Sequence, residues 1–558
     1  MIRKHQKLNK KHGAIFIALC CIALFIPSLI AQNNATQSHV SPYIPTADRY
    51  QRNRVFLEYA DKLSMKDGQN YQLLVGNVQF RKGDMFMYCD SAHFYDQTNS
   101  IDAFGNVKME QGDTLFVYAD ELNYNGDIEL AKLFADQGKK VKLINNDVML
   151  ETDIFNYDLS IDLGYYDVGG VLTDKQNRLE SLQGEYSPST KDANFYLDVH
   201  LNNISERGDT LDMYTDTLSY NTNTHIAELV SLTHIISKDG KIIAQSGTYN
   251  TETNISDLYD RSIVITKDGN TLTGDTIFYD RNKGYGEAFG NMILTDSIRQ
   301  SSIQGDYGFY NQLTDSAYVT GRACAKEYSQ KDTLYLHGKV IRTYILKEDT
   351  SRVMIAHPNV RFYRSDLQGL CDSLSIMQRD TILYMHKHPI VWSGVRQIFG
   401  NVIHVHMNDS TVDWAKLPDF GFVAEHIDEE FYNQISGKEM MAYFKESKLS
   451  HVDVSGNVQI ITLPQESDST YNKIANVESS FLSADIENNK IVFSKIWPEV
   501  TAKMTPLYLA KKSIFYLPKF KWYETIRPKD PEDIFNIPQE MKDLFNAPEV
   551  STRRRLSK

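Results

Sequence analysis

The residues of this chain best suited to chemistry are histidines in two closely spaced pairs. The pairs have the spacing His-x-His and comprise His386 with His388 and His404 with His406. Side chains two residues apart on a strand share one face, so each pair could present two imidazoles to a zinc ion, with Asp409 or Asp413 nearby. No His-Glu-x-x-His sequence and no cysteine ligand accompanies them. We interpret these histidines as exposed strand residues and assign no metal site.

Acidic and hydroxyl residues form a second set, in which Asp-Ser or Asp-Thr precedes an apolar residue. Such triplets begin at Asp90, Asp113, Asp209, Asp216, Asp332 and Asp372. A turn leading into a strand explains them, because an Asp side chain bonds to the turn backbone, and O-glycosylation is the alternative. A glycosidase carboxylate pair cannot be distinguished among 72 acidic residues. We predict no catalytic residue, no cofactor and no enzyme, with a β-helix polysaccharide lyase or hydrolase as the rival class.

The elements that position these residues are indicated by a repeat. Gly-Asn-Val begins at residue 76 and again at residue 105, each time followed by Tyr-x-Asp, and Gly-Asn returns at residues 290, 400 and 456. A second mark, Asp-Thr followed by Leu or Ile, occurs at residues 209, 275, 332 and 380. Gly and Asn tolerate positive φ and Asp caps turns, so we interpret each mark as a turn before a strand.

Apolar and polar residues alternate within each predicted strand. Val78 and Phe80 share one face of a strand, and Val107 and Met109 share the matching face of another. Repeat units of about 28 residues, with two or three short strands each, cannot bury such a face alone and must stack along an axis. The sequence therefore predicts an all-β fold, an elongated, repeat-built β-jelly roll or open β-solenoid.

The start of the chain has the features of a secretory signal. Basic residues precede an apolar stretch from Gly13 to Ile30, and the small residue Ala31 marks a cleavage site. An uncleaved membrane anchor is the alternative. Removing the five basic residues of this segment leaves 54 of the 59 against 72 acidic residues, a net charge of −18, which argues against a nucleic-acid partner.

Cysteine usage predicts neither a disulfide framework nor a metal knuckle. The mature chain would keep Cys89, Cys324 and Cys371, with no Cys-x-x-Cys spacing. We expect all three to be buried and unpaired, and one long-range disulfide is the alternative.

The domain organisation follows from these signals. We predict a signal peptide at residues 1–31, a linker at 32–54, repeat blocks at 55–165, 166–345 and 346–525, and a linker with a C-terminal tail at 526–558. Within the tail, one short amphipathic helix is indicated by Ile534, Phe535, Ile537, Met541, Leu544 and Phe545, before the basic residues 553–555. We expect this tail to be frayed, and a docking peptide is the alternative.

The order of the motifs resembles the OstA/LptA family of lipopolysaccharide transport and organic solvent tolerance proteins, and most of all its long, repeat-rich OstA-like members. The resemblance rests on Gly-Asn-Val, Gly-Asp-Thr-Leu, Tyr-Ala-Asp and Leu-x-Tyr in sequence, and it spans roughly residues 55–461. It implies a periplasmic, V-shaped β-jelly roll whose apolar groove holds lipid acyl chains and whose sheet edges stack end to end. This chain departs from the short members in its length and acidity.

We therefore predict a periplasmic, outer-membrane-associated protein that binds lipopolysaccharide or a related glycolipid and carries or bridges it towards the outer membrane. Strand edges would stack on other envelope transport proteins or on further copies of this chain. The candidate groove lining is Val78, Phe80, Val107, Met109, Val458 and Ile460, and ordinary packed core is the alternative for these residues. The alternative function is a structural or adhesive β-solenoid scaffold of the cell envelope without a lipid ligand.

Overall fold

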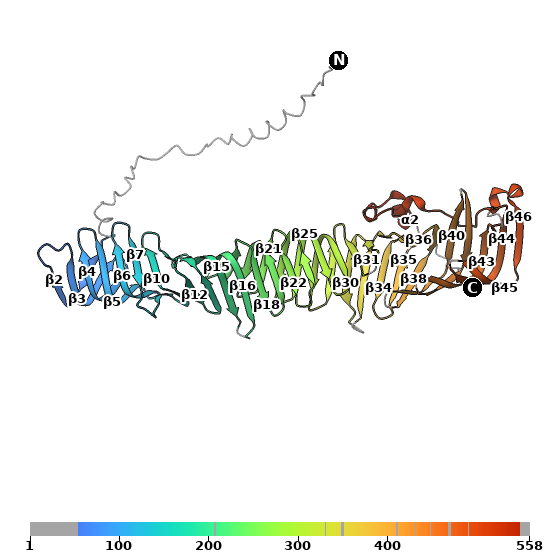
Figure 1. Cartoon of the computed structure of the whole chain (residues 1–558). Helices are drawn as coiled ribbons and strands as arrows, with labels where there is room; N and C mark the ends of the chain where they lie inside the picture. The colour runs from blue at the N-terminus through green and yellow to red at the C-terminus, as the bar shows by residue number, and fades with distance from the viewer. Residues whose placement is uncertain are drawn as a thin grey trace, which may run out of the picture. The chain divides into compact units, whose positions relative to one another are not determined.

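The computed structural model describes residues 54–205, 208–329, 331–347, 351–408, 411–428, 430–446, 448–466, 470–488 and 490–546. The chain divides into two units, residues 1–54 and 55–558. The predicted signal peptide and linker therefore lie outside the described residues, except for Arg54. The second unit contains, among its described residues, 46 strands in one continuous antiparallel network and one α-helix, with the strands following one another in chain order (Figure 1). The predicted all-β, repeat-built fold is confirmed.

The second unit begins with two short strands and four long, bent ones. They are β1 (Phe56–Tyr59), β2 (Lys62–Ser64), β3 (Gln72–Lys82), β4 (Met85–Tyr95), β5 (Ser100–Gln111) and β6 (Leu115–Asn125). One 29-residue repeat therefore holds two long strands with two arms each. The expectation of two or three short strands per repeat was wrong here, because each long strand carries two alternating patterns.

Most of the next strands are short, and bent strands return in pairs. The strands are β7 (Leu130–Phe134), β8 (Val141–Asn145), β9 (Val148–Thr152), β10 (Ile154–Asp158), β11 (Leu163–Tyr166), β12 (Gly170–Asp174), β13 (Asn177–Ser181), β14 (Gln183–Tyr186), β15 (Asp192–Ile204), β16 (Thr210–Asn221), β17 (Ile226–Leu229), β18 (Thr233–Ser237), β19 (Gly240–Ala244), β20 (Ser246–Asn250), β21 (Ile255–Tyr259), β22 (Ile263–Thr266), β23 (Thr271–Thr273), β24 (Thr276–Asp280), β25 (Tyr285–Asp296) and β26 (Ser301–Asn311).

The same alternation continues to the last strands. These are β27 (Ser316–Thr320), β28 (Cys324–Glu327), β29 (Leu334–His337), β30 (Val340–Ile345), β31 (Arg352–His357), β32 (Val360–Arg364), β33 (Leu367–Cys371), β34 (Ser373–Met377), β35 (Ile382–His386), β36 (Ile390–Ser393), β37 (Arg396–Gly400), β38 (Val402–Asn408), β39 (Thr411–Leu417), β40 (Gly421–Asp428), β41 (Phe431–Gly437), β42 (Glu439–Lys445), β43 (Lys448–Thr462), β44 (Lys473–Glu487), β45 (Lys490–Trp497) and β46 (Thr501–Pro506).

Strand pairing sorts the network into two facing layers. The first layer joins β7, β10, β11 and β14, and the second joins β8, β9, β12 and β13. Each bent strand gives one arm to each layer, since its pairing register shifts at the bend, as in β5 between Phe104 and Val107. The bends join the layers along one side of the roll. Along the other side, which we call the seam, the hairpin turns of the two layers meet.

Four of the five Gly-Asn marks form the bends, whereas Gly400-Asn401 lies where β37 ends and β38 begins, and it precedes a strand as predicted. Gly76 and Asn77 lie inside β3 with φ of 85° and 45°, and the Asn77 amide donates to Asp61 of the preceding Tyr-Ala-Asp triplet at 3.0 Å. Asn106 bonds to Asp90 in the same way at 2.8 Å. The interpretation of these marks as turns before strands was wrong at β3, β5, β25 and β43, because each is a bulge that carries one strand between layers. The Asp-Thr marks do precede strands, as predicted.

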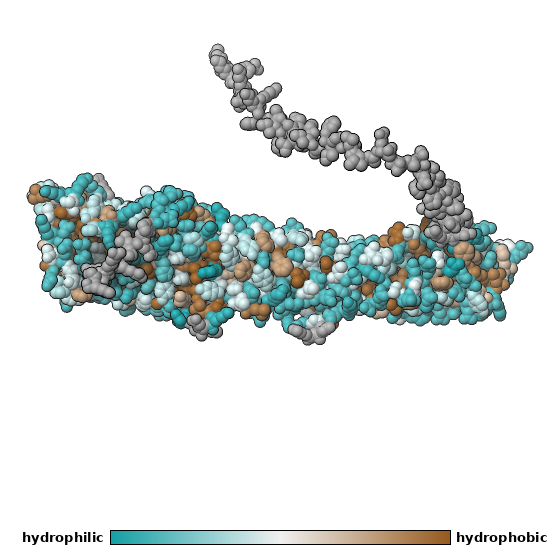
Figure 2. All heavy atoms as spheres, turned by 180° about the vertical axis from the view of Figure 1, so that it is seen from behind, coloured by the Kyte–Doolittle hydropathy of each residue, from teal (hydrophilic) through white to brown (hydrophobic). Residues whose placement is uncertain are grey.

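The core lies between the two layers. One cluster of buried apolar residues runs from Val55 to Leu482 and contains side chains from both layers. Phe80 of the second layer and Phe94 of the first lie with ring centroids 5.5 Å apart. The outer surface seen in Figure 2 is mostly hydrophilic, with apolar residues in separate patches. The alternation of the sequence therefore gives one buried and one wet face, as predicted.

A segment that follows β46 covers the outer face of the second layer, and we call residues 507–546 the strap. It contains η2 (Leu507–Leu509), η3 (Lys512–Ile514), η4 (Glu524–Ile526), η5 (Asp533–Phe535) and α2 (Gln539–Asn546). Gln434, Gln397 and Arg361, from β41, β37 and β32, bond in turn to the strap backbone. None of the helices in the described part of the chain is long and apolar enough to span a membrane.

The described part of the tail is docked, and the expectation of a frayed tail was wrong for it. Ile526 and Met541 are buried against Trp392 and Phe422 of the sheet. The predicted amphipathic helix exists but covers only Gln539–Asn546, because Ile534 and Phe535 belong to a 3-10 turn. The basic residues 553–555 lie outside the described residues.

Candidate functional site

The six candidate lining residues all point between the layers. The second-layer arms of β3 and β5 carry the first four, and the second-layer arm of β43 carries the other two; they are Val78, Phe80, Val107, Met109, Val458 and Ile460. All six are buried and belong to the same continuous core cluster. The structure therefore places them in one interior, although β3 and β43 lie near opposite ends of the roll. Their role as a lipid-contacting lining stays a prediction.

The interior is packed. The cavity found at its start has a volume of about 30 Å³, and another, at Ile235 and Tyr249, has about 20 Å³. A volume of roughly 30 Å³ is the share of one molecule in liquid water, so neither space holds an acyl chain as it stands. A ligand could enter only where the two layers can separate. The seam is such a place, because the layers are not joined there by continuous strands.

Hydrogen bonds close the seam through residues 141–281, which we call the locked segment. In its centre the Tyr220 hydroxyl, from the first layer, donates to Asp174 of the second layer at 2.7 Å. His225 Nδ1 lies 3.0 Å from the same Asp174 oxygen. Asn177 of the second layer donates to the Tyr220 oxygen at 2.9 Å, and all four side chains are buried. Burial raises the pKa of Tyr220, and Asp174 raises it further.

Two further interlayer bonds flank this cluster. Asn145 of β8 donates to the Tyr186 hydroxyl of β14 at 3.0 Å. Arg281 of the first layer pairs with Asp239 of the second at 3.2 Å. The Asn145–Tyr186 bond is buried and therefore costly to separate, so it holds the locked segment shut together with the Tyr220 cluster. Asp239 is exposed, and its ion pair adds less.

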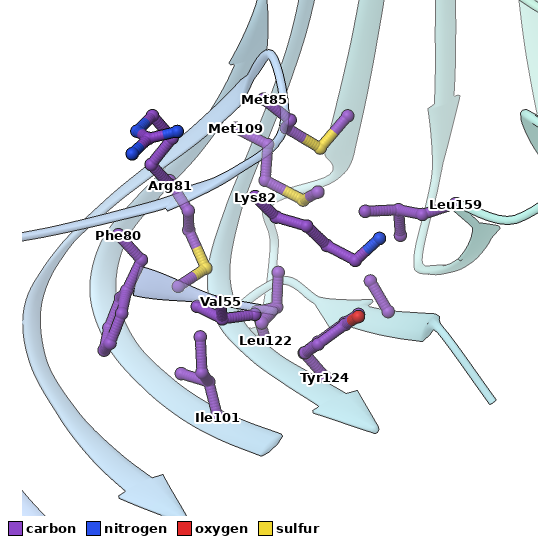
Figure 3. A pocket seen from close by; sticks show the side chains of 12 residues that line it. Val55, Phe80, Arg81, Lys82, Met85, Ile101, Met109, Leu122, Tyr124 and Leu159 are labelled. Atoms are coloured by element: carbon purple, nitrogen blue, oxygen red, sulfur yellow. The ribbon is translucent and has the colours of Figure 1, made fainter. Parts of the chain in front are cut away.

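The seam differs in residues 55–134, which we call the proximal segment. Lys82, at the end of β3, pairs with Glu129, just before β7, with Lys82 Nζ 2.7 Å from Glu129 Oε2. Behind this ion pair lies the 30 Å³ cavity, whose lining, apart from Lys82 and Arg81, is apolar or aromatic (Figure 3). Met85, Met87 and Met109 line its second-layer side, and unbranched methionine side chains can change rotamer readily. The Val55 amide also donates to Asn99 Oδ1 across this seam at 2.8 Å. The proximal seam is thus closed by one ion pair, one hydrogen bond and side chains that can change rotamer.

One buried tyrosine of the cavity lacks a partner. Tyr124 of β6 is 6% exposed, and its hydroxyl is buried with no hydrogen-bond partner among the described residues. Burial, together with nearby Glu129, raises the pKa of this hydroxyl, which stays protonated and able to donate. Sequence reasoning found the Leu-x-Tyr motif but not this property, because a missing partner across the layers leaves no local signal.

His386, His404 and His406 lie on the outward faces of β35 and β38, as predicted for strand residues. His388 lies in the turn between β35 and β36, so the strand prediction was wrong for it. His404 of β38 lies opposite Tyr384 of β35, and the His406 ring stacks on Trp414 with centroids 5.2 Å apart. Desolvation lowers the pKa of His404. Asp409 lies outside the described residues, whereas Asp413 pairs with His406 at 3.1 Å. Among the side chains that the structure describes, no group of three His, Cys, Asp or Glu could hold a metal ion.

The cysteines behave as predicted. Cys89, Cys324 and Cys371 are buried and unpaired. Burial raises the thiol pKa of Cys89 to about 12 and that of Cys324 to about 11. These thiols are therefore small core side chains rather than reactive groups.

Two protein families match the first part of the roll. A family described as OstA-like protein matches residues 52–207, and a lipopolysaccharide-assembly, LptC-related family matches residues 160–266. Residues 52–207 of this chain are therefore similar to the OstA-like family. The OstA-like match covers the proximal segment and part of the locked segment. The LptC-related match overlaps the end of the OstA-like match and lies within the locked segment. The resemblance predicted from the motifs is confirmed.

The curated proteins and the solved structures were compared as well. A search of curated proteins finds no significant match to this chain. A similar solved structure is LptH, the LptA homologous periplasmic component of the conserved lipopolysaccharide transport device from Pseudomonas aeruginosa. The two chains are 11% identical, the likeness covers 20% of this chain and 76% of LptH, and the TM-score is 0.17.

Proposed function

We propose that this chain is an exported, periplasmic protein that binds lipopolysaccharide or a related glycolipid and carries or bridges it towards the outer membrane. The acyl chains would lie between the two layers and the sugar outside. The proposal rests above all on the apolar core cluster, which runs unbroken from Val55 to Leu482. An apolar path of this kind suits a ligand with several acyl chains that must cross water. The lipopolysaccharide-assembly description of the LptC-related family supports the same ligand class.

The proposed lipid contacts are Val78, Phe80, Val107, Met109, Val458 and Ile460. These residues lie between the layers at both ends of the core cluster, so a lipid between the layers would touch them. Because the interior is packed, binding requires the layers to part at the seam. The proposal needs neither a catalytic group nor a cofactor.

Partners would add to the open ends of the two layers. Among the described strands, β1 and β2 pair only with β3, and β45 and β46 pair only with β44. Their outer edges therefore remain available for backbone pairing. β45 is exposed along most of its length and carries Ile491, Val492 and Phe493. We propose that other envelope transport proteins, or further copies of this chain, pair with these edges.

Site-specific photo-crosslinking in cells tests the proposal. A photoreactive residue replaces Phe80 or Met109, which face inward, or Gln79 or Lys108, which face outward and serve as matched controls on the same strands. We expect glycolipid adducts from the inward positions only. No adduct from either pair, in folded and exported protein, would overturn the proposal.

A scaffold without a lipid ligand is the second candidate. The observation that favours it is the packing of the interior at the proximal seam, where the cavity has only about 30 Å³. A scaffold predicts that detergent or lipid leaves the hydrogen exchange of the inward strands unchanged. A lipid carrier predicts that added lipopolysaccharide changes exchange in the proximal strands first.

A further inference from the structure

The cavity of the proximal segment lies where the continuous core reaches the seam. Its second-layer wall is formed by Phe80, Met85, Met87 and Met109, and its first-layer wall by Ile101, Leu122, Tyr124 and Ala131. Figure 3 shows Lys82 and the methionines across the cavity from Leu122 and Tyr124, with Leu159 at one side. The space is small, but it connects the apolar interior with the seam.

A series of buried tyrosines follows the same side of the first layer. The series comprises Tyr124, Tyr157, Tyr186, Tyr220 and Tyr249. The last four have partners, because Tyr157 bonds to Asp162, Tyr186 to Asn145, Tyr220 to Asp174 and Tyr249 to Asn254. Tyr124 alone of the five has a buried hydroxyl without a partner in the described structure. A buried donor without an acceptor is costly, so this position is suited to a ligand that supplies the acceptor.

The rim of the cavity carries positive charge. Lys82 pairs with Glu129 and keeps little of its side chain exposed. Arg81 pairs with Glu58 and lies over the Phe56 ring, with its guanidinium carbon 5.5 Å from the ring centroid. Both basic groups could exchange their carboxylate partners for another anion at the mouth of the cavity.

We propose that this cavity is the port through which an acyl chain of an anionic glycolipid enters the roll. The chain displaces the methionine side chains, the carbonyl of its ester or amide linkage accepts a hydrogen bond from Tyr124, and an anionic group of the headgroup replaces Glu129 on Lys82. This inference rests on the proposed function and names the point of entry and the ligand groups recognised there. Leu159, in the locked segment, also lines the cavity, and the buried hydrogen bonds of that segment would keep the neighbouring seam closed.

The first test separates recognition at the port from lipid binding in general. The probe is purified rough-type lipopolysaccharide, and full-length protein carries a photoreactive residue at Met109 or, in separate protein, at Ile460. We expect Tyr124→Phe to lower the adduct yield at Met109 about fivefold and Lys82→Glu about tenfold. Lys238→Glu is the matched control, because Lys238 also holds an ion pair beside a hairpin turn, with Asp209, but in the locked segment. This control should leave the yield unchanged.

The second test closes the port reversibly. Lys82→Cys and Glu129→Cys are combined with Cys20→Ser and Cys21→Ser, and the pair is bridged with a bifunctional thiosulfonate that a reductant removes. The buried thiols Cys89, Cys324 and Cys371 should not react. We expect bridging to abolish the Met109 adduct and reduction to restore it. Asp239→Cys with Arg281→Cys provides the matched bridge in the locked segment, which should have no effect.

The outcomes distinguish the port from the proposed function. The port is overturned if adducts at Met109 persist in the bridged protein and if Tyr124→Phe and Lys82→Glu leave their yield unchanged. The proposal of lipid binding would then remain. No adduct at Met109 or Ile460 in the unsubstituted background overturns both. Loss of adducts by all three changes, with recovery on reduction, supports the port.

Discussion

The proximal and locked segments share one architecture but close their seams by different means. In the locked segment, Tyr220 joins a buried cluster with Asp174, Asn177 and His225 that crosses from one layer to the other. In the proximal segment, Tyr124 stands without a partner beside a cavity and methionines. The same repeat position is therefore satisfied within the protein in one segment and left unsatisfied in the other.

This difference means that the segment that stabilises the roll is not the segment through which a ligand could reach its interior. A buried polar cluster holds a fixed geometry strongly, because opening it exposes several groups that lose their partners at once. The proximal seam, with methionine packing, one ion pair and the Val55–Asn99 hydrogen bond, resists opening less, because methionine side chains can repack. A long roll can thus remain rigid over most of its length and still open at one place.

The largest expected effect comes from disrupting the buried cluster around Asp174 in the locked segment. Asp174→Ala removes the acceptor of Tyr220 and the partner of His225, and it should lower the local free energy of opening by about 2–4 kcal/mol. Native-state hydrogen exchange of β12 and β16 measures this loss, since a long repeat need not unfold in one step. Unchanged protection in both strands would show that the buried cluster does not hold the seam. The locked and proximal segments would then not differ in how firmly they are closed.

The next effect concerns the bends, which both segments share. Gly105 has φ of 76°, and a Cβ there would lie 2.5 Å from Asp90 Oδ2. Gly105→Ala should therefore cost about 1–3 kcal/mol in local stability. At the corresponding bend of β15, Leu197 has φ of 63°, so Leu197→Gly should be neutral or stabilising. Exchange protection of β5 and β15 tests the pair, and a loss in both variants would contradict a common bend geometry.

Alternation made the strands and the inward faces predictable. Val78 and Phe80 were assigned to one face from spacing alone, and both are buried, because side-chain direction in a strand follows position directly. The bends were not predictable in this way. A bulge inside one strand gives the same Gly-Asn signal as a turn between two strands, and only the folding of one arm over the other distinguishes them.

The contacts at the seam and the position of the strap were not predicted either, because both depend on residues that are far apart in the sequence. Lys82 and Glu129 are 47 residues apart, and Asp174 and His225 are 51 apart, so their pairing depends on which turns meet across two layers. The strap had an available signal in strands that are apolar on both faces, such as Ile390–Ser393 with Trp392. Such strands indicate cover on both sides, but they do not name the segment that covers them.

A smaller effect is expected at the proximal ion pair. Glu129→Gln removes the charge opposite the largely buried Lys82 but keeps a group that can accept a hydrogen bond, so local stability should fall by about 1–2 kcal/mol. The change should increase exchange in β3 and β7 while leaving β12 unaffected. A loss as large as that of Asp174→Ala would show that the proximal seam is locked as firmly as the rest.

The smallest effect provides the sharpest comparison, because it uses the same substitution at equivalent positions. Tyr124→Phe removes a hydroxyl that bonds to nothing in the described structure, so the free energy of opening should change by about zero or rise slightly. Tyr220→Phe leaves Asp174 and Asn177 without a shared partner and should cost about 1–3 kcal/mol. Denaturant unfolding followed by exchange of β6 and β16 measures both variants. Equal losses would mean that Tyr124 has a partner in solution, and the port would then lose the unsatisfied donor on which ligand recognition depends.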